Sequence, residues 1–206
     1  MKRRIFLLFA LLSLVEMLAI SGGTNKVFGQ SGTLNGHEYV DLGLPSGTKW
    51  ATCNVGASNP HEYGDYFAWG ETKPKGSYYD IGNYMYFSDY DVLPASADAA
   101  TGNWGEGWRM PTKAEYYELV NNCKWTWLYN GYKVVGTNGN GIFLPAAGGH
   151  FGSELGNADS YGVYWSSSIY KGNTECAWGL EFHSERYDMT HCGRCYGLAV
   201  RPVCAQ

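Results

Sequence analysis

Glycine and aromatic side chains dominate this chain and limit what it can fold into. The 206 residues include 28 glycines, 17 tyrosines and 8 tryptophans, and aromatic residues make up 16% of the sequence against 17% for charged residues. Glycine supplies the left-handed backbone of tight turns, whereas tyrosine and tryptophan bury large apolar areas. The combination predicts a loop-rich fold with little helix and an aromatic core. The tryptophans expected in that core are Trp50, Trp69, Trp104, Trp108, Trp165 and Trp178.

The first residues have the pattern of a cleavable secretory signal. A basic head at residues 2–4 precedes an unbroken apolar run, Ile5–Val15, which Glu16 interrupts. The run is long enough to engage the export machinery and too short to span a bilayer, which takes about 20 apolar residues. We therefore expect a signal peptide at residues 1–29, with cleavage before Gln30 and no membrane span after cleavage. An uncleaved membrane anchor is the alternative interpretation.

The part of the chain after the signal is acidic and has the size of one domain. Cleavage would remove four basic residues and one acidic residue from totals of 15 and 19, which leaves a net charge of about −7. A surface of that sign repels phosphate groups and disfavours nucleic acid as a partner. Because this part of the chain contains no internal repeat or linker, we expect a short lead-in at residues 30–35 and one domain over residues 36–206. We expect the mature protein to be secreted, periplasmic or on the cell surface.

Hydrophobic spacing and turn residues predict an α+β domain. One helix should begin at Thr112, because Thr112 and Glu115 form a capping box and the residues at 116, 119, 120 and 123 then lie on one helical face. A second, shorter helix is expected within residues 94–101. The predicted strands cover residues 37–42, 49–53, 63–70, 141–145, 162–167, 177–182 and 196–203. Strands followed by a helix and then by antiparallel strands are typical of an α+β fold.

Six cysteines follow the signal, and an exported chain could pair them. They are Cys53, Cys123, Cys176, Cys192, Cys195 and Cys204. The sequence does not choose among the possible pairings. The crowding of four cysteines between 176 and 204 favours at least one disulfide there, whereas Cys53 and Cys123 could equally be buried free thiols.

Several short motifs follow one another in a fixed order through nearly the whole mature chain. They are GHEYVDLGLPSGTKWATCNVG at 36–56, YGDYFAWGE at 63–71, GWRMPT at 107–112, FLPAAG at 143–148, YWSSS at 164–168 and VRPV at 200–203. Together they resemble the major paralogous domain family (FISUMP) first recognised in Fibrobacter succinogenes and common in exported proteins of gut Bacteroidetes. The resemblance implies a C-type-lectin-like fold, shared with formylglycine-generating enzymes, with two helices, small antiparallel sheets and adjacent chain ends. It does not fix an activity.

The motifs that bind calcium in true C-type lectins are missing from this sequence. Those lectins use a Glu-Pro-Asn or Gln-Pro-Asp loop and a Trp-Asn-Asp strand, whereas here Trp165 is followed by Ser166 and Ser167. A hard cation needs several oxygen ligands. We therefore expect calcium-independent binding, with no metal and no cofactor.

Cys192 and Cys195 suggest two other kinds of chemistry. A formylglycine-generating-type oxidase uses a pair of cysteines near its C-terminus, and a catalytic thiol needs a depressed pKa and access to solvent. The cysteine spacing here differs from that of the enzyme, which favours a structural role. With His183 and His191 these cysteines could hold zinc, but the ligand spacing is irregular.

Residues 183–196, HSERYDMTHCGRCY, are rich in side chains that make binding contacts. Tyrosine and arginine dominate binding hot spots, and in the related fold this segment and residues 170–175 form one exposed face. An ordinary polar hairpin is the alternative. Twelve of the fourteen residues are reachable by randomising the adenines of AAY codons, as in variable proteins that retroelements diversify. A hypervariable binding patch is therefore a further hypothesis.

The sequence thus predicts an exported, non-enzymatic module that binds a glycan or protein outside the cell through its C-terminal hairpin. The expected contacts are Tyr170, Glu175, His183, Arg186, Tyr187, Asp188, His191, Arg194 and Tyr196. Two alternatives are a structural component of the cell envelope or a fimbria, and an oxidase of the formylglycine-generating type that uses Cys192 and Cys195.

Overall fold

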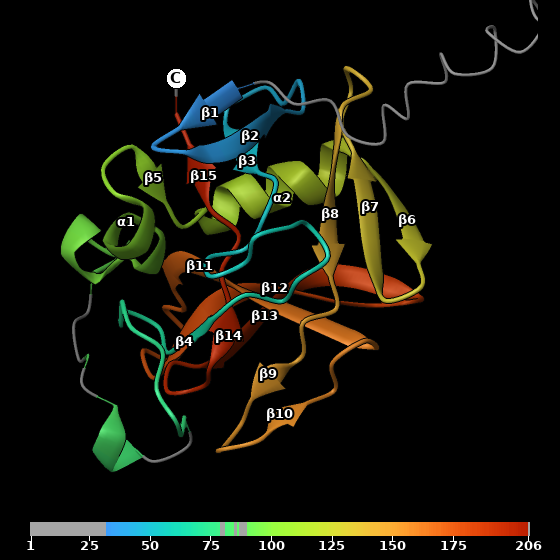
Figure 1. The fold of residues 1–206 in the computed structure, drawn as a ribbon. Helices are drawn as coiled ribbons and strands as arrows, with labels where there is room; N and C mark the ends of the chain where they lie inside the picture. The colour runs from blue at the N-terminus through green and yellow to red at the C-terminus, as the bar shows by residue number, and fades with distance from the viewer. Residues whose placement is uncertain (1–31, 79–80, 85, 87–89, 206) are drawn as a thin grey trace, which may run out of the picture.

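The computed structural model describes residues 32–78, 81–84, 86 and 90–205 (Figure 1). The predicted signal peptide, residues 1–29, lies outside them. The described chain is mostly β-structure, with two short α-helices and several small sheets whose strands are mainly antiparallel. This agrees with the predicted helices and small antiparallel sheets, although strands outweigh helices.

The first sheet brings the two ends of the described chain together. Its strands lie in the order β1-β2-β3-β15-β5. Their bounds are β1 Gly32–Leu34, β2 His37–Asp41, β3 Lys49–Ala51, β15 Val203–Cys204 and β5 Trp108–Arg109. The predicted hairpin forms from β2 and β3, and β1 adds to it from within the predicted lead-in. The late strand β15 lies between β3 and β5 and pairs with both.

The second sheet contains the longest strands, in the order β13-β12-β11-β14-β4. Their bounds are β4 Tyr66–Phe67, β11 Tyr161–Ile169, β12 Cys176–His183, β13 Arg186–Gly193 and β14 Leu198–Ala199. Only two residues of the strand predicted at 63–70 pair, as β4. The flanking Gly64 and Gly70 have φ of 76° and 84°, a left-handed conformation that ends an extended strand.

The prediction of one continuous strand at residues 196–203 is wrong. The segment divides into β14, in the second sheet, and β15, in the first. Leu198, Ala199 and Val200 are all fully buried. The segment passes through the interior between the two sheets, so the alternation of apolar residues does not mark one exposed face.

A third sheet has the order β6-β7-β8, and a separate two-stranded ribbon pairs β9 with β10. Their bounds are β6 Lys124–Leu128, β7 Gly131–Val135, β8 Gly141–Pro145, β9 Gly149–His150 and β10 Leu155–Gly156. Strand β8 is the buried strand predicted at 141–145, and all five of its residues are buried. The β6–β7 hairpin was not predicted.

Helix α2, Lys113–Asn122, begins at the predicted capping box. The Thr112 hydroxyl accepts a hydrogen bond from the Glu115 N–H (3.3 Å), and the Glu115 carboxylate accepts one from the Thr112 N–H (2.8 Å). These bonds satisfy donors that the first helical turn leaves without partners. On the predicted apolar face, Tyr116 and Leu119 are fully buried.

The shorter predicted helix, residues 94–101, is displaced toward the C-terminus. A 3-10 turn, η3 (Ala95–Ala97), is followed by α1, Ala99–Trp104. Asp98 separates them and caps α1, because its carboxylate accepts a hydrogen bond from the Thr101 N–H (3.0 Å). A second 3-10 turn, η2, covers Ile81–Asn83.

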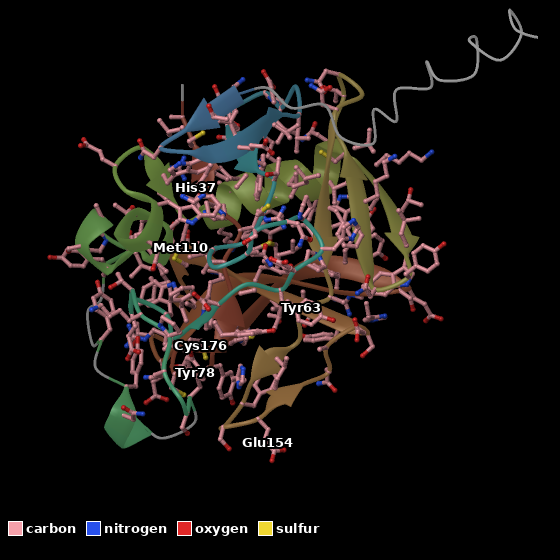
Figure 2. All side chains as sticks on the ribbon, viewed as in Figure 1. His37, Tyr63, Tyr78, Met110, Glu154 and Cys176 are labelled. Atoms are coloured by element: carbon pink, nitrogen blue, oxygen red, sulfur yellow. The ribbon has the colours of Figure 1, made fainter. Side chains whose placement is uncertain are left out.

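Two hydrophobic cores lie on opposite faces of β11. Val163 and Trp165 pack in the core that contains α1, whereas Tyr164 packs in the core that contains Tyr116 of α2. Successive side chains of a strand point to opposite faces, so both faces of β11 are covered. Figure 2 shows side chains filling this interior, with Met110 (1% exposed) inside it and Glu154 at the edge beside the β9–β10 ribbon.

Arg201 is a fully buried cation that links separate parts of the fold. Its guanidinium donates hydrogen bonds to the side-chain oxygen of Asn54 (2.8 Å), the carbonyl of Ala51 (3.1 Å) and the carbonyl of Phe143 (2.9 Å). These oxygens replace the water that a buried charge loses. Arg201 thereby ties the C-terminal segment to the first sheet and to β8.

Candidate binding groove beside helix α2

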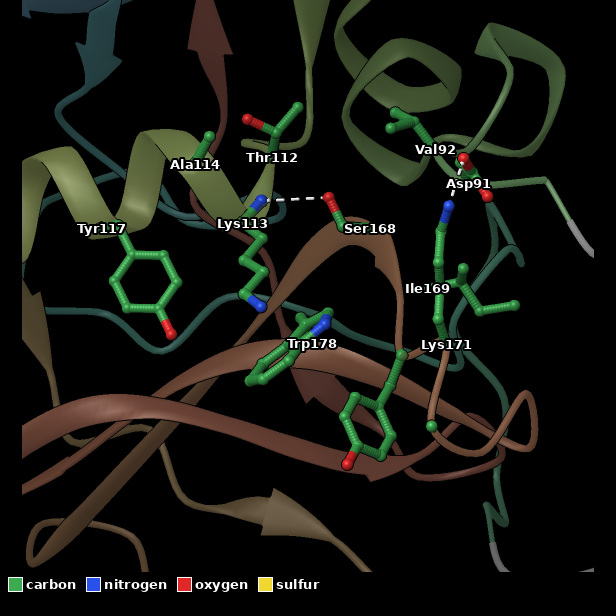
Figure 3. Close-up of a pocket in the computed structure, with 12 residues that line it drawn as sticks. Asp91, Val92, Thr112, Lys113, Ala114, Tyr117, Ser168, Ile169, Lys171 and Trp178 are labelled. Carbon is green, nitrogen blue, oxygen red and sulfur yellow. Dashed lines mark hydrogen bonds and ion pairs between the residues drawn. The ribbon is translucent and has the colours of Figure 1, made fainter.

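An open groove of about 620 Å³ lies between the first turns of α2 and the end of the β11–β12 hairpin (Figure 3). It is lined by Asp91, Val92, Thr112, Lys113, Ala114, Tyr117, Ser168, Ile169, Tyr170, Lys171, Gly172 and Trp178. A pocket of this volume is in the usual range of small-ligand sites, about 300–1,000 Å³. We refer to it as the α2 groove.

Aromatic rings form the α2 groove's apolar surface. Trp178 of β12 and Tyr170, which follows β11, meet edge to face with ring centroids 5.1 Å apart. Tyr117, on α2, is 38% exposed and adds a third ring. Trp178 shares its strand face with Leu180 and is only half-buried, whereas Leu180 is fully buried. The expectation that Trp178 belongs to the core is therefore wrong, because the core ends before it.

The other tryptophans expected inside the molecule are buried. Trp50, Trp69, Trp108 and Trp165 are at most 1% exposed, and Trp104 is 8% exposed.

Lys113 places a positive charge over the aromatic surface. Its ammonium lies 3.4 Å from the centroid of the Trp178 ring system and 5.4 Å from that of Tyr117 (Figure 3). Lys113 and Tyr117 are four residues apart and share one side of the helix. Both contacts are cation–π interactions. Within the described chain, none of the ion pairs involves Lys113.

The backbone holds the two walls of the groove together. The Lys113 N–H donates a hydrogen bond to the Ser168 hydroxyl (3.0 Å), which joins α2 to β11. On the opposite rim, Lys171 and Asp91 form an ion pair of 2.7 Å with side chains 73% and 69% exposed. Among the residues that the structure describes, no carboxylate pairs with Lys113 in the groove.

Lys113 and Tyr117 were not among the predicted site residues. Their helical spacing is visible in the sequence, but a lysine and a tyrosine at the border of an apolar stripe ordinarily extend toward solvent. Only the approach of β12 to α2 gives them a shared groove, and that contact joins segments more than fifty residues apart.

The nine predicted contacts do not share one face. Strands β12 and β13 pair along their whole length, and His191 lies opposite Trp178 while Asp188 lies opposite Glu181. Since residues directly opposite in a sheet point to the same side, His191 faces the α2 groove and Asp188 faces away from it.

Two of the predicted contacts belong to the α2 groove or its border. Tyr170 lines the groove, and its ring stacks on the His191 imidazole with centroids 4.0 Å apart and an angle of 4° between planes. Tyr187 lies on the same sheet face but packs away from the groove, against Trp125 at 4.5 Å.

Other predicted contacts are exposed elsewhere on the hairpin. Arg186 and Asp188 form an ion pair of 3.2 Å with side chains 61% and 50% exposed. His183 and Glu175 are exposed at opposite ends of β12.

Arg194 and Tyr196 lie in the turn that follows β13 and pack inward. Arg194 is 6% exposed, and its guanidinium lies 5.4 Å from the Trp69 ring and 5.8 Å from the Tyr84 ring. Arg194 is therefore not on an exposed face as expected, and its role as a contact stays a prediction. Tyr196 is half-buried and packs edge to face on Phe151 at 5.0 Å.

The cysteines of the described chain are all free thiols. Burial raises the pKa of Cys192 to about 12 and also raises the pKa of Cys195. A reactive thiol needs a lowered pKa, because the thiolate is the nucleophile. These two cysteines therefore lack the electrostatic surroundings of a catalytic pair. At least one disulfide among Cys176, Cys192, Cys195 and Cys204, with the pairing left open, stays a prediction.

No group of three or more His, Cys, Asp and Glu side chains is placed to hold a metal ion among the residues that the structure covers. The same residues include no helix with the length and apolar character needed to cross a bilayer. Comparisons with protein-family models, with curated proteins and with solved structures find no match to this chain.

Proposed function

We propose that this chain is an exported, non-enzymatic binding module with a C-type-lectin-like fold, and that it holds a saccharide in the α2 groove. The observation that carries the proposal is a single groove of about 620 Å³ in which three partly exposed aromatic rings line the surface and the Lys113 ammonium lies over two of them. The fold and the exported location rest on the sequence motifs and the signal pattern.

Aromatic rings suit a sugar because each pyranose has an apolar face of C–H groups. A sugar ring laid on Trp178 would bury apolar area on both partners, and Tyr117 and Tyr170 would border it. The hydroxyl groups at the sugar's edge would meet the polar rim of Ser168, Asp91 and Lys171. An apolar surface with a few polar groups at its border is the usual composition of a ligand site. No step of this binding needs calcium.

The hairpin β12–β13 supplies a second exposed surface on the opposite side of the sheet. Arg186, Asp188 and His183 lie there in reach of a larger ligand. A protein that contacts this side is the second candidate ligand, and the exposed Arg186 favours it.

The nucleotide sequence around the gene tests the hypothesis that residues 183–196 are hypervariable. The hypothesis fails if no adenine-rich near-copy of this stretch lies nearby.

A glycan array followed by titration calorimetry tests the proposed function. We expect the wild-type protein to bind at least one saccharide class without calcium, and Trp178→Ala to weaken that binding about tenfold or more, as loss of a stacking ring should. Tyr129→Ala is the control, because Tyr129 is 97% exposed in the β6–β7 turn and does not line the groove. Equal binding by the two variants, or no saccharide bound at all, contradicts the proposal.

The rival functions predict different results in the same preparations. An envelope or fimbrial component would assemble into large particles without ligand, which light scattering detects. An oxidase would need rapid alkylation of Cys192 or Cys195 in the folded protein near neutral pH.

A further inference from the structure

We propose that the α2 groove selects acidic saccharides and that Lys113 recognises their negative charge. This inference rests on the proposed function and adds the chemical class of the ligand. Its starting point is the position of the Lys113 ammonium, 3.4 Å from the centroid of the Trp178 ring system.

The ammonium occupies the ring face on which a sugar would stack. A neutral sugar that stacks there must displace it and gives up the cation–π contact without an equivalent in return. An acidic sugar compensates for that loss, because its anionic group accepts a charge-assisted hydrogen bond from the displaced ammonium. Lysine has a flexible stem of four carbons, which lets the ammonium move from the ring face to the edge of the bound sugar. The arrangement therefore discriminates between neutral and acidic ligands.

The charges around the groove support the same choice. Asp91 is the one carboxylate among the lining residues within the described part of the chain, and it pairs with Lys171 at 2.7 Å. Among the described lining residues, Lys113 and Lys171 together with Asp91 give one net positive charge, whereas the whole chain has a formal net charge of −4. A local positive charge on an otherwise acidic protein attracts the anionic part of a ligand to this groove.

Carboxylate and sulfate groups could both supply the anion. A carboxylate would come from a uronic or sialic acid, and a sulfate from a sulfated sugar. The chemistry common to them is an oxyanion at the edge of a pyranose ring. Matched probes separate the two sources: trigalacturonic acid with its methyl ester, sialyllactose with lactose, and lactose sulfate with lactose.

The experiment measures the affinity of each matched pair for wild type and for Lys113→Met, Lys124→Met and Trp178→Ala. Methionine keeps most of the lysine stem and removes the charge. Lys124 is exposed on β6 and does not line the groove, so Lys124→Met controls for the loss of one positive charge. We expect wild type to bind at least one acidic probe about tenfold more tightly than its neutral partner.

Lys113→Met should lose that preference and bind the neutral partner at least as well as wild type, because the ring face is then free of the ammonium. Lys124→Met should keep the preference, and Trp178→Ala should weaken both members of the pair. High salt should weaken only the acidic member in the wild-type protein.

The outcomes separate the inference from the proposed function. If wild type binds neutral and acidic partners equally, or if Lys113→Met keeps the acidic preference, the inference is wrong while saccharide binding at Trp178 stands. If no member of any pair binds, both are wrong.

Discussion

The imidazole of His191 lies flat against the ring of Tyr170, with centroids 4.0 Å apart and planes inclined by 4°. Tyr170 lines the α2 groove and His191, on β13, borders it. The stack joins the edge strand of the second sheet to the corner after β11, and it fixes the orientation of one of the groove's aromatic rings.

Replacing His191 by alanine should loosen Tyr170 and weaken saccharide binding several-fold. The expected cost to the free energy of unfolding is about 0.5–1 kcal/mol, the usual contribution of an aromatic pair. Calorimetry and a urea titration measure the two effects. His183→Ala is the matched control, because His183 is exposed on the neighbouring strand and does not line the groove. Unchanged affinity in His191→Ala, or an equal loss in His183→Ala, would show that the groove does not depend on the stack.

Glu115 should make the stability of the protein sensitive to acid. Burial alone would raise the Glu115 pKa, but hydrogen bonds from Arg109, Thr112 and Thr48 outweigh it and lower the pKa from 4.5 to about 2. A carboxyl whose pKa is lower in the folded state stabilises the protein above the unfolded-state pKa. That contribution is lost as the pH falls from about 5 to about 2.

We expect this loss to be about 2 kcal/mol, less than the full shift implies, because Arg109 is 39% exposed and water screens the pair. Urea unfolding at a series of pH values measures it. Glu115→Gln should be less stable at neutral pH and should flatten the acid dependence, whereas Glu118→Gln, on the same helix, should not. An unchanged slope in Glu115→Gln contradicts the assignment.

Substitution of Arg201 should unfold the protein or nearly so. Arg201→Met removes the donors to Asn54, Ala51 and Phe143 and leaves three buried oxygens without partners. The expected cost is about 3–5 kcal/mol. The exposed Arg186 provides the comparison, since Arg186→Met should cost less than about 0.5 kcal/mol. Circular dichroism during thermal unfolding measures both variants, and similar midpoints would contradict the role of Arg201.

Thiol alkylation should show Cys192 to be unreactive. Its pKa of about 12 leaves almost no thiolate at pH 8. Iodoacetamide labelling of the reduced, folded protein, followed by mass spectrometry, should modify Cys192 far more slowly than the same cysteine in urea. Equal rates in the two conditions would contradict this expectation, and faster labelling of the folded protein would support the oxidase alternative.

Local sequence signals predicted the elements whose stabilising contacts are local. The start of α2 follows from Thr112 and Glu115, because a capping box needs only four adjacent residues. The β6–β7 hairpin, which was not predicted, also has a local signal. Trp125 and Trp127 alternate with polar residues, and the Asn130-Gly131 pair is typical of a hairpin turn.

The contacts between distant segments could not be predicted in the same way. Nothing within residues 196–203 shows that the chain leaves one sheet for another, since that depends on pairing with β4 and β3. The site has the same character. Tyr170 was predicted as a contact, but Lys113 becomes part of a groove only because Trp178 lies beneath it.

The position of β15 makes the first sheet depend on the last strand that enters it. Val203 and Cys204 fill the space between β3 and β5, and each of these strands would otherwise carry an open edge. Proteolytic removal of a few C-terminal residues should therefore act on the entire domain and not on a peripheral tail. The domain's resistance to carboxypeptidase would then report on its global unfolding.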